Sequence, residues 1–336
     1  MAQPLKITLY GALVYDLAEV LQRKLATSAT ITRLKEDAGA AALREALSDS
    51  DVLLAMDYRD MPPAHRLRLL QIPGAGTDRV NLAEVPSAAY VCNAYGHDIA
   101  GAEYVLAGIL AWCYDLIEAH ESFKAGSWRM SGRYGAPIHH ELHGKTVGIL
   151  GLGPIGLKTA ELAKAFGTRI LACNRTARPQ PAWIDAQYPL SRLHEFLDAC
   201  DFVVVSIALT PETTGLIDAA GFAAMRPNAV IVNVSRGPVI DEDALFDALQ
   251  SRRIAGAVID AWYRYPMPPD LTTPPSKHPF HQLSNIIMTP HSSIWTHGMI
   301  DRRWTEIAAN IDALARGEPL INIVRKPAAR SAAAVG

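Results

Sequence analysis

A strand, a glycine-rich turn and a helix follow one another in TVGILGLGPIGLKTAELAKAF, residues 146–166. The glycines have G-x-G-x-x-G spacing, which permits a tight turn, a close approach of backbone to a pyrophosphate, and close helix packing. The helix start also offers unpaired N–H groups and a favourable dipole to phosphates. A glycine turn without a ligand is the weaker interpretation. The predicted dinucleotide-binding residues in this turn are Gly151, Gly153, Pro154, Ile155 and Gly156.

Short apolar runs alternate with helical patterns on both sides of this motif. Before it, strands are predicted at 6–10, 30–34, 51–55, 67–72 and 90–93, with helices at 17–25 and 38–47 between them. From Thr146 the alternation resumes with TVGIL, RILAC, DFVVVSI, AVIVNVS, GAVID and NIIMT. This rhythm is typical of parallel sheets covered by helices, so we predict an α/β fold with two doubly wound domains. A longer helix, 100–124, and an irregular arm, 126–144, are predicted to join the halves.

Composition narrows the class of partner. The 336 residues are 49% hydrophobic and 20% charged, with a net charge of −2 and no dense basic run. We therefore expect neither nucleic acid nor a membrane as a partner. The four cysteines form no CxxC pair and the start of the chain lacks a signal-peptide pattern, so a soluble cytoplasmic protein is expected.

The end of the strand after the glycine turn bears on cofactor choice. An acid about twenty residues beyond the glycines would bind the ribose 2′-hydroxyl of NAD. Here ACNRT places Asn174 at that position, followed by Arg175 and Thr176, with Arg178 nearby. Arginine suits a 2′-phosphate, so the pattern favours NADP, with NAD still acceptable. The alternative is that Arg175 covers the adenine face while either cofactor binds.

Six segments, the glycine turn among them, resemble in their order and spacing the D-isomer-specific 2-hydroxyacid dehydrogenase family over nearly the whole chain. They are GAGTDRVN, GLGPIG, DFVVVSIALTPETTGLI, NVSRGPVIDEDAL, GAVIDAWYRYP and NIIMTPHSS. The resemblance implies a Rossmann domain, 99–291, inserted into a flavodoxin-like substrate domain, 1–98 and 292–336. It also implies a homodimer built through segment 100–143.

The resemblance implies roles for individual residues. Arg236 would grip the carboxylate of a small anionic substrate and polarise its 2-oxygen, a task that suits a bidentate cation. His291 would be the general acid/base, since hydride delivery to a carbonyl leaves an alkoxide that needs a proton. Asp260 would bind the nicotinamide carboxamide. The remaining implied contacts are Ser206, Thr210 and Ser235 with the cofactor, and the backbone of Ala75 and Gly76 with the substrate.

One catalytic position departs from the family. The residue before the proline of DAWYRYP is normally Glu, which binds the catalytic histidine and raises its pKa; here it is Tyr265. A hydroxyl orients the imidazole but adds no charge at neutral pH, so the pKa of His291 should be lower than in the Glu pattern. The acids proposed as substitutes are Glu103, Glu212 and Glu242.

The favoured function is an NADP-preferring reductase of a 2-keto acid of the glyoxylate or hydroxypyruvate type. The missing Glu keeps open the oxidation of a small anion, as in formate dehydrogenases (which carry Gln there) and phosphite dehydrogenases. A dinucleotide-dependent interaction protein of the corepressor type is a third alternative. No metal is expected, because His139, His140 and His143 have loose spacing in a loop and hydride transfer needs none.

Overall fold

The computed structural model describes residues 3–176, 181–266 and 270–328. Two units make up the chain: Met1–Gly96 together with His297–Gly336, and His97–Thr296 between them. The sequence boundaries predicted at 98/99 and 291/292 differ from these by a few residues. Both units are mixed α/β, each with one sheet, as expected for two doubly wound domains.

The first unit contains a six-stranded sheet in the order β13-β5-β4-β3-β1-β2. All neighbouring strands are parallel except β13, which pairs antiparallel with β5 at the edge. Without β13 this is the flavodoxin-like order 2-1-3-4-5. The strands are β1 (Leu5–Tyr10), β2 (Ala29–Leu34), β3 (Val52–Ala55), β4 (Leu69–Gln71), β5 (Tyr90–Cys92) and β13 (Ile323–Arg325).

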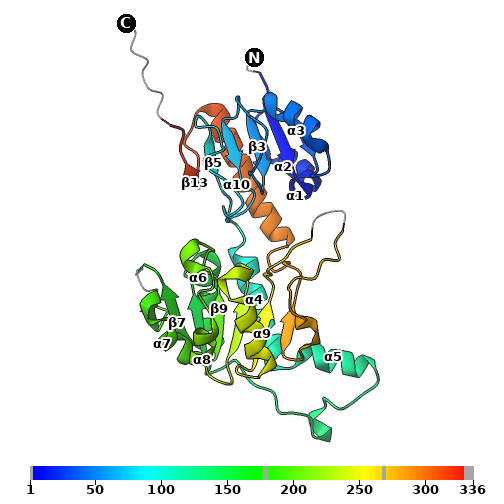
Figure 1. Cartoon of the computed structure of the whole chain (residues 1–336), viewed down its shortest axis with the longest axis vertical. Helices are drawn as coiled ribbons and strands as arrows, with labels where there is room; N and C mark the ends of the chain where they lie inside the picture. Colours follow the sequence, from blue (N-terminus) through cyan, green and yellow to red (C-terminus); the bar gives the residue numbers. More distant parts are fainter. Residues whose placement is uncertain (1–2, 177–180, 267–269, 329–336) are drawn as a thin grey trace. The chain divides into compact units, whose positions relative to one another are not determined.

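The central strands of this sheet carry apolar side chains on both faces, and helices cover both faces. Leu54 of β3 packs with α1 (Ala12–Asp16), α2 (Ala18–Lys24) and Trp304 of α10 (His297–Arg316). Leu53, one residue earlier, points to the other face and packs with Leu43 and Leu47 of α3 (Gly39–Ser48). Helix α10, drawn in orange, completes a core whose other helices come from the blue start of the chain (Figure 1).

The second unit contains seven parallel strands in the order β12-β11-β10-β9-β6-β7-β8. Counted from β6, this is the Rossmann order 3-2-1-4-5-6 with one more strand at the edge. The strands are β6 (Thr146–Leu150), β7 (Arg169–Asn174), β8 (Ala186–Pro189), β9 (Phe202–Val205), β10 (Val230–Asn233), β11 (Gly256–Ile259) and β12 (Ile286–Met288). The sequence did not predict β8, a short edge strand that is only half-buried and ends in proline.

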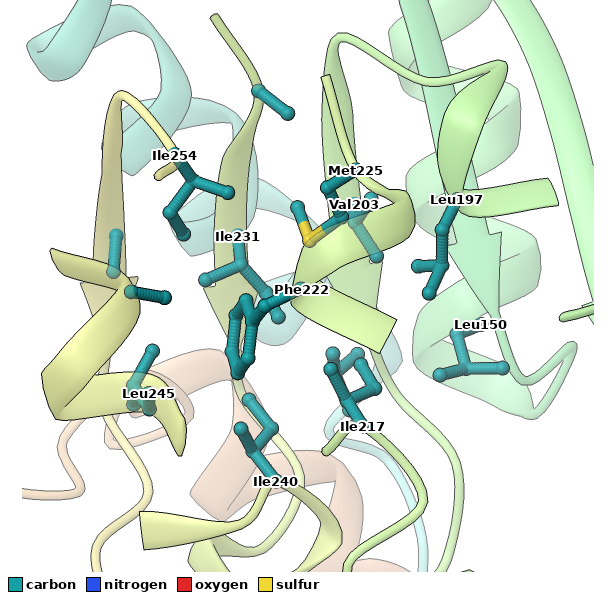
Figure 2. Packing of buried hydrophobic residues seen from close by; sticks show 14 of the residues in the cluster. Leu150, Leu197, Val203, Ile217, Phe222, Met225, Ile231, Ile240, Leu245 and Ile254 are labelled. Atoms are coloured by element: carbon teal, nitrogen blue, oxygen red, sulfur yellow. The ribbon is translucent and has the colours of Figure 1, made fainter. Parts of the chain in front are cut away.

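Alternate residues of these strands enter two separate cores. Val204 and Val232 pack with α4 (Asp98–Cys113) and α6 (Pro154–Lys164). Val203 and Ile231 pack on the opposite face with α7 (Leu193–Asp198), α8 (Ala219–Ala224) and α9 (Glu242–Gln250). Figure 2 shows Phe222 of α8 near the centre of this second core, beside Ile231 and Ile240. Short 3-10 turns complete the unit: η1 (Gly132–Tyr134), η2 (Leu190–Arg192), η3 (Pro211–Thr213), η4 (Gly237–Val239) and η5 (Phe280–Gln282).

The single helix predicted over 100–124 is wrong. The chain forms α4 and then α5 (Leu116–Lys124), bent by 62° at a break whose residue Asp115 has a φ of 46°. Up to Cys113 the helix is held against the sheet, with Trp112 lying directly over Gly256, whereas α5 buries only Ser122. Across the described ranges no single helix is long and apolar enough to span a membrane; only the bent α4–α5 pair passes that test jointly.

Candidate active site

The glycine turn connects β6 to α6, and its three glycines have different reasons to be glycine. Gly151 has a φ of 101°, which other residues rarely adopt. A Cβ on Gly156 would lie 2.1 Å from the carbonyl oxygen of Gly151, so the helix can pack only without a side chain. A Cβ on Gly153 would meet nothing closer than the Ser206 carbonyl oxygen at 4.0 Å. The protein itself therefore does not require glycine at 153, and the space above it fits an approaching phosphate.

The start of α6 lacks a side-chain cap. Gly153 is the N-cap residue and has no side chain to accept a hydrogen bond from the first N–H groups, and Pro154 occupies the first turn. Such a helix start favours an anion. The strand order reverses between β6 and β9, where nucleotides bind in folds of this type. The residues present therefore fit the pyrophosphate of a dinucleotide.

Two predicted cofactor residues follow β9. The hydroxyl of Ser206 donates to the carbonyl oxygen of Gly151 at 2.7 Å, so this side chain supports the glycine turn itself. Thr210 forms a capping box with Thr213 at the start of η3. Both residues lie beside the carboxyl edge of the sheet and shape the loop there.

Asn174 ends β7 and contacts the glycine turn directly. Its Oδ1 accepts the N–H of Leu152 at 2.9 Å, which fixes the orientation of the amide. Its Nδ2 is buried and has no hydrogen-bond partner among the described residues. The contact of Asn174 with the ribose of a cofactor stays a prediction. Arg175 and Thr176 are exposed next to it, and Arg178 lies outside the described residues.

Arg236 follows β10 in a tightly organised loop. The amide of buried Asn233 accepts from the N–H and hydroxyl of Ser235, both at 3.0 Å, and donates to the carbonyl oxygen of Arg236 at 3.1 Å. Gly237 packs so closely that a Cβ there would lie 2.3 Å from the carbonyl oxygen of Trp262. The half-buried Arg236 is thus held beside the segment that follows β11.

Asp260, which follows β11, fixes the loop that carries His291. Its buried carboxylate accepts the N–H of Ser292 at 2.8 Å and the N–H of Ser293 at 2.9 Å. The hydroxyl of Thr289 also donates to it, at 2.6 Å, and is itself bonded to the hydroxyl of Tyr104 on α4. Burial raises the pKa of Tyr104, so the phenol stays neutral. Neither residue was predicted from the sequence: Thr289 lies in the matched segment NIIMTPHSS, whereas Tyr104 lies in none of the six segments.

His291 is exposed and has a φ of 57°, a left-handed conformation unusual outside glycine. Its Nδ1 lies 2.6 Å from the hydroxyl of Tyr265, whose oxygen also accepts the backbone N–H of Trp262 at 3.1 Å. Tyr265 therefore occupies the place at the imidazole that the family pattern gives to Glu. Of the acids proposed as substitutes, Glu242 binds Ser276 and Lys277 instead.

The other two proposed acids have different surroundings. Glu212 is exposed, and a hydrogen bond from Thr210 lowers the pKa of its carboxyl, with a smaller effect of Arg175. Glu103 is exposed on α4.

The predicted substrate loop belongs to the first unit and is held from within that unit. Asn93 donates to the carbonyl oxygen of Ala75 at 2.8 Å, and the N–H of Ala94 donates to that of Gly74 at 3.0 Å. Buried Arg303 donates to the carbonyl oxygen of Pro73, and burial lowers the pKa of its guanidinium to about 10. The backbone of Ala75 and Gly76 is thus rigidly supported, and its role in binding an anion stays a prediction.

One histidine of the cluster in the arm, His139, has contacts with neighbouring side chains. His139 lies 3.5 Å from the carboxylate of Asp115 and its ring packs near that of Tyr114. In the parts of the chain that the structure describes, no three His, Cys, Asp or Glu side chains are grouped so as to hold a metal ion.

Comparisons with known proteins agree with this arrangement. Residues 106–293 match the family model described as D-isomer specific 2-hydroxyacid dehydrogenase, NAD binding domain. The chain is 33% identical over 296 residues to the glyoxylate reductase of Thermococcus gammatolerans, covering 84% of this chain and 85% of that one. It is 32% identical over 283 residues to the D-3-phosphoglycerate dehydrogenase of Mycobacterium leprae, covering 82% of this chain and 51% of that one.

A solved structure extends the comparison to the whole fold. The NADPH-dependent glyoxylate/hydroxypyruvate reductase of Sinorhizobium meliloti, in complex with NADP and malonate, superposes with a TM-score of 0.79. It is 25% identical, and the match covers 98% of this chain and 100% of that one. The chain is therefore an oxidoreductase with a nicotinamide-dinucleotide-binding Rossmann domain, and it belongs to the D-isomer-specific 2-hydroxyacid dehydrogenase family.

Proposed function

We propose that this enzyme reduces a small 2-keto acid of the glyoxylate or hydroxypyruvate type and prefers NADPH. The observation that carries the proposal is the shared edge of one parallel sheet. The glycine turn follows β6, Arg236 follows β10, Asp260 follows β11 and His291 follows β12. Because parallel strands end at the same edge, the cofactor turn, a cation and an imidazole belong to one edge of the second unit.

Each residue has a defined task in this proposal. The bound dinucleotide supplies the hydride. Arg236 binds the substrate carboxylate and polarises the keto oxygen; Asn233 fixes its backbone carbonyl, and its guanidinium donates to the carbonyl oxygen of Ser235. His291 donates a proton to that oxygen as it gains charge, and Tyr265 orients the ring. Asp260 holds the histidine loop and, at the cofactor side, accepts from the nicotinamide carboxamide.

The preference for NADPH rests on the end of β7. An acid at position 174 would repel a 2′-phosphate, whereas the amide of Asn174 is uncharged and the exposed Arg175 adds a positive charge next to it. The Sinorhizobium meliloti relative, described as NADPH-dependent, supports the same preference.

Turnover on a panel of substrates tests the reaction. NADPH absorbance is followed with glyoxylate, hydroxypyruvate, pyruvate and phenylpyruvate, using wild type, Arg236→Ala and the exposed control Arg192→Ala. We expect turnover on at least one keto acid, its loss in Arg236→Ala, and an unchanged rate in the control. Oxidation of formate or phosphite without keto-acid reduction would favour the second enzymatic function, which the absence of Glu at 265 suggests. Cofactor binding with no turnover on any of these anions would favour an interaction protein.

We also propose a cytoplasmic homodimer assembled through segment 100–143. The four cysteines are buried free thiols, which suits a reducing compartment. Large apolar side chains are exposed on α5 and the arm, among them Phe123, Trp128 and Tyr134, whose rings pack edge to face. Ile138 of the arm is also 95% exposed, and exposed apolar side chains gathered in one segment are typical of an interaction surface. Sedimentation of wild type and Ile138→Asp tests this: a dimer that the substitution weakens is expected, and a monomeric wild type contradicts it.

A further inference from the structure

The phenol oxygen of Tyr265 lies between two nitrogen atoms with different hydrogen-bonding capacities. The backbone nitrogen of Trp262, at 3.1 Å, can only donate, so the phenol oxygen is its acceptor. Nδ1 of His291, at 2.6 Å, can donate or accept according to its tautomer. An oxygen that accepts one hydrogen bond is polarised to donate its own hydrogen more strongly. The contact with Trp262 therefore favours donation from Tyr265 to the imidazole.

A carboxylate at position 265 would act in the opposite direction. It can only accept, so Nδ1 would have to carry the hydrogen, and the neutral ring would present a lone pair at Nε2. With tyrosine, we propose that the hydroxyl donates to Nδ1 of neutral His291, so that Nε2 carries the hydrogen. Tyr265 is thus a positioning residue that sets the tautomer of the catalytic imidazole. This inference deepens the proposed function and rests on it for the nature of the substrate.

The tautomer of the neutral imidazole decides whether Nε2 of His291 donates a hydrogen bond to a substrate oxygen or accepts one from it. Both the neutral and the protonated ring then carry a hydrogen at Nε2, so both bind a carbonyl oxygen as a donor. In the protonated ring, Nδ1 also carries a hydrogen and Tyr265 turns to accept it. Taking a proton from a 2-hydroxy acid would require a lone pair at Nε2, hence a prior shift of one proton from Nε2 to Nδ1. Nε2 of His291 can therefore donate a hydrogen bond to the keto oxygen of the substrate both below and above the pKa of the ring.

Two ionisable groups near the histidine loop, Asp260 and Tyr104, form hydrogen bonds with groups other than the imidazole. Asp260 directs its carboxylate to the N–H groups of Ser292 and Ser293, and Tyr104 is bonded to the hydroxyl of Thr289. These contacts fix the loop backbone on either side of the ring. The bond to Tyr265 is a direct contact with Nδ1 and so acts differently on the two tautomers.

Nitrogen NMR of the full chain labelled with ¹⁵N-histidine tests the proposal without any substrate. The protein has 11 histidines, and the signal absent from His291→Gln identifies the one needed. In wild type, at a pH where the ring is neutral, we expect the hydrogen on Nε2 and a bare Nδ1. In Tyr265→Glu we expect the reverse. A hydrogen on Nδ1 in wild type, or the same tautomer in both proteins, would overturn the proposal.

Binding of oxamate, an unreactive keto-acid analogue with a carbonyl acceptor, provides a second readout in the NADPH complex. Its affinity is compared within each protein, below and above the pKa of His291 determined by the same NMR titration. We expect the fall in affinity on deprotonation to be at least about tenfold larger in Tyr265→Glu, because only that variant loses the Nε2 hydrogen. Equal falls in the two proteins count against the proposal. If no keto acid turns over while the NMR result holds, the proposed function fails and the tautomer assignment stands.

Discussion

A side-chain carbon at Gly156 would lie 2.1 Å from the carbonyl oxygen of Gly151, whereas one at Gly153 would meet only the carbonyl oxygen of Ser206 among the described residues, at 4.0 Å. The two glycines therefore serve different purposes, one in folding and one in binding.

Alanine substitutions separate these purposes. Gly156→Ala should lower the free energy of unfolding by about 1–3 kcal/mol, because the helix must shift away from the turn. Gly153→Ala should change stability by less than about 1 kcal/mol, since its φ of −75° suits any residue, but weaken NADPH binding at least tenfold. Urea unfolding without cofactor and fluorescence titration with NADPH measure the two effects. Equal losses of stability would contradict the assignment.

Asn174→Asp should shift cofactor preference toward NADH. A carboxylate can still accept the N–H of Leu152, so the fold should persist, but it would repel a 2′-phosphate and accept from a ribose hydroxyl. We expect the ratio of kcat/KM for NADPH to that for NADH to fall by about tenfold or more. Arg175→Ala should reduce only the NADPH value. If both variants changed the two cofactors equally, the preference would have to originate elsewhere.

Asp260→Ala should reduce kcat by about a hundredfold, because the loop that carries His291 would lose its fixed geometry. Each buried N–H left without its acceptor also costs about 1–3 kcal/mol of stability. Asp260→Asn keeps one acceptor oxygen and should lose less activity, and Tyr104→Phe, which removes only the bond to Thr289, less again. Steady-state kinetics with urea unfolding check this order; activity unaffected in Asp260→Ala would refute the anchoring role.

Tyr265→Glu should move the pH dependence of keto-acid reduction upward. The added carboxylate stabilises the charged imidazole and so raises the pKa of His291, by about one pH unit. Reduction, which needs the protonated ring, should then persist to higher pH than in wild type. The profile of kcat/KM against pH measures the shift, and Tyr265→Phe controls for loss of the ring contact. An unchanged limb in the Glu variant contradicts the expectation.

Burial raises the pKa of the Cys92 thiol to about 12. The unfolded thiol ionises near pH 8.5, so above that pH the unfolded state binds fewer protons than the native state. Stability is therefore retained below about pH 8.5 and is lost at up to about 1.4 kcal/mol per pH unit as the pH rises further. Urea unfolding between pH 7 and 10 should show a shallower decline in Cys92→Ala than in wild type. Parallel declines in the two proteins would show that Cys92 is not responsible.

Local patterns account for most of what the sequence could predict. The glycine turn is specified by its own residues, and the buried strands by runs of β-branched side chains. Edge strand β8 escaped because it is half-buried and lacks such a run. The break between α4 and α5 escaped because the two residues that separate them, Tyr114 and Asp115, include no glycine or proline to mark it.

Individual site residues could be predicted from the sequence, but the hydrogen bonds that hold them in place could not. Tyr104 and Thr289 are 185 positions apart, and their bond depends on helix α4 lying beside the end of β12. Asp260 could be identified from its segment, but its grip on Ser292 and Ser293 depends on where two strands end in space. Such contacts belong to the fold and have no local signature.

The order in which the chain is made gives helix α10 a particular importance. Trp304 and Ile307 fill a core whose other walls are the strands and helices at the very start of the chain. During translation, part of the apolar surface of those elements stays uncovered until α10 has been synthesised. Residues 97–296, which form the second unit, leave the ribosome before it. Helix α10 therefore completes the core of the first unit only after the second unit has been synthesised, and a nascent chain stalled before residue 297 would expose apolar surface that a chaperone can bind.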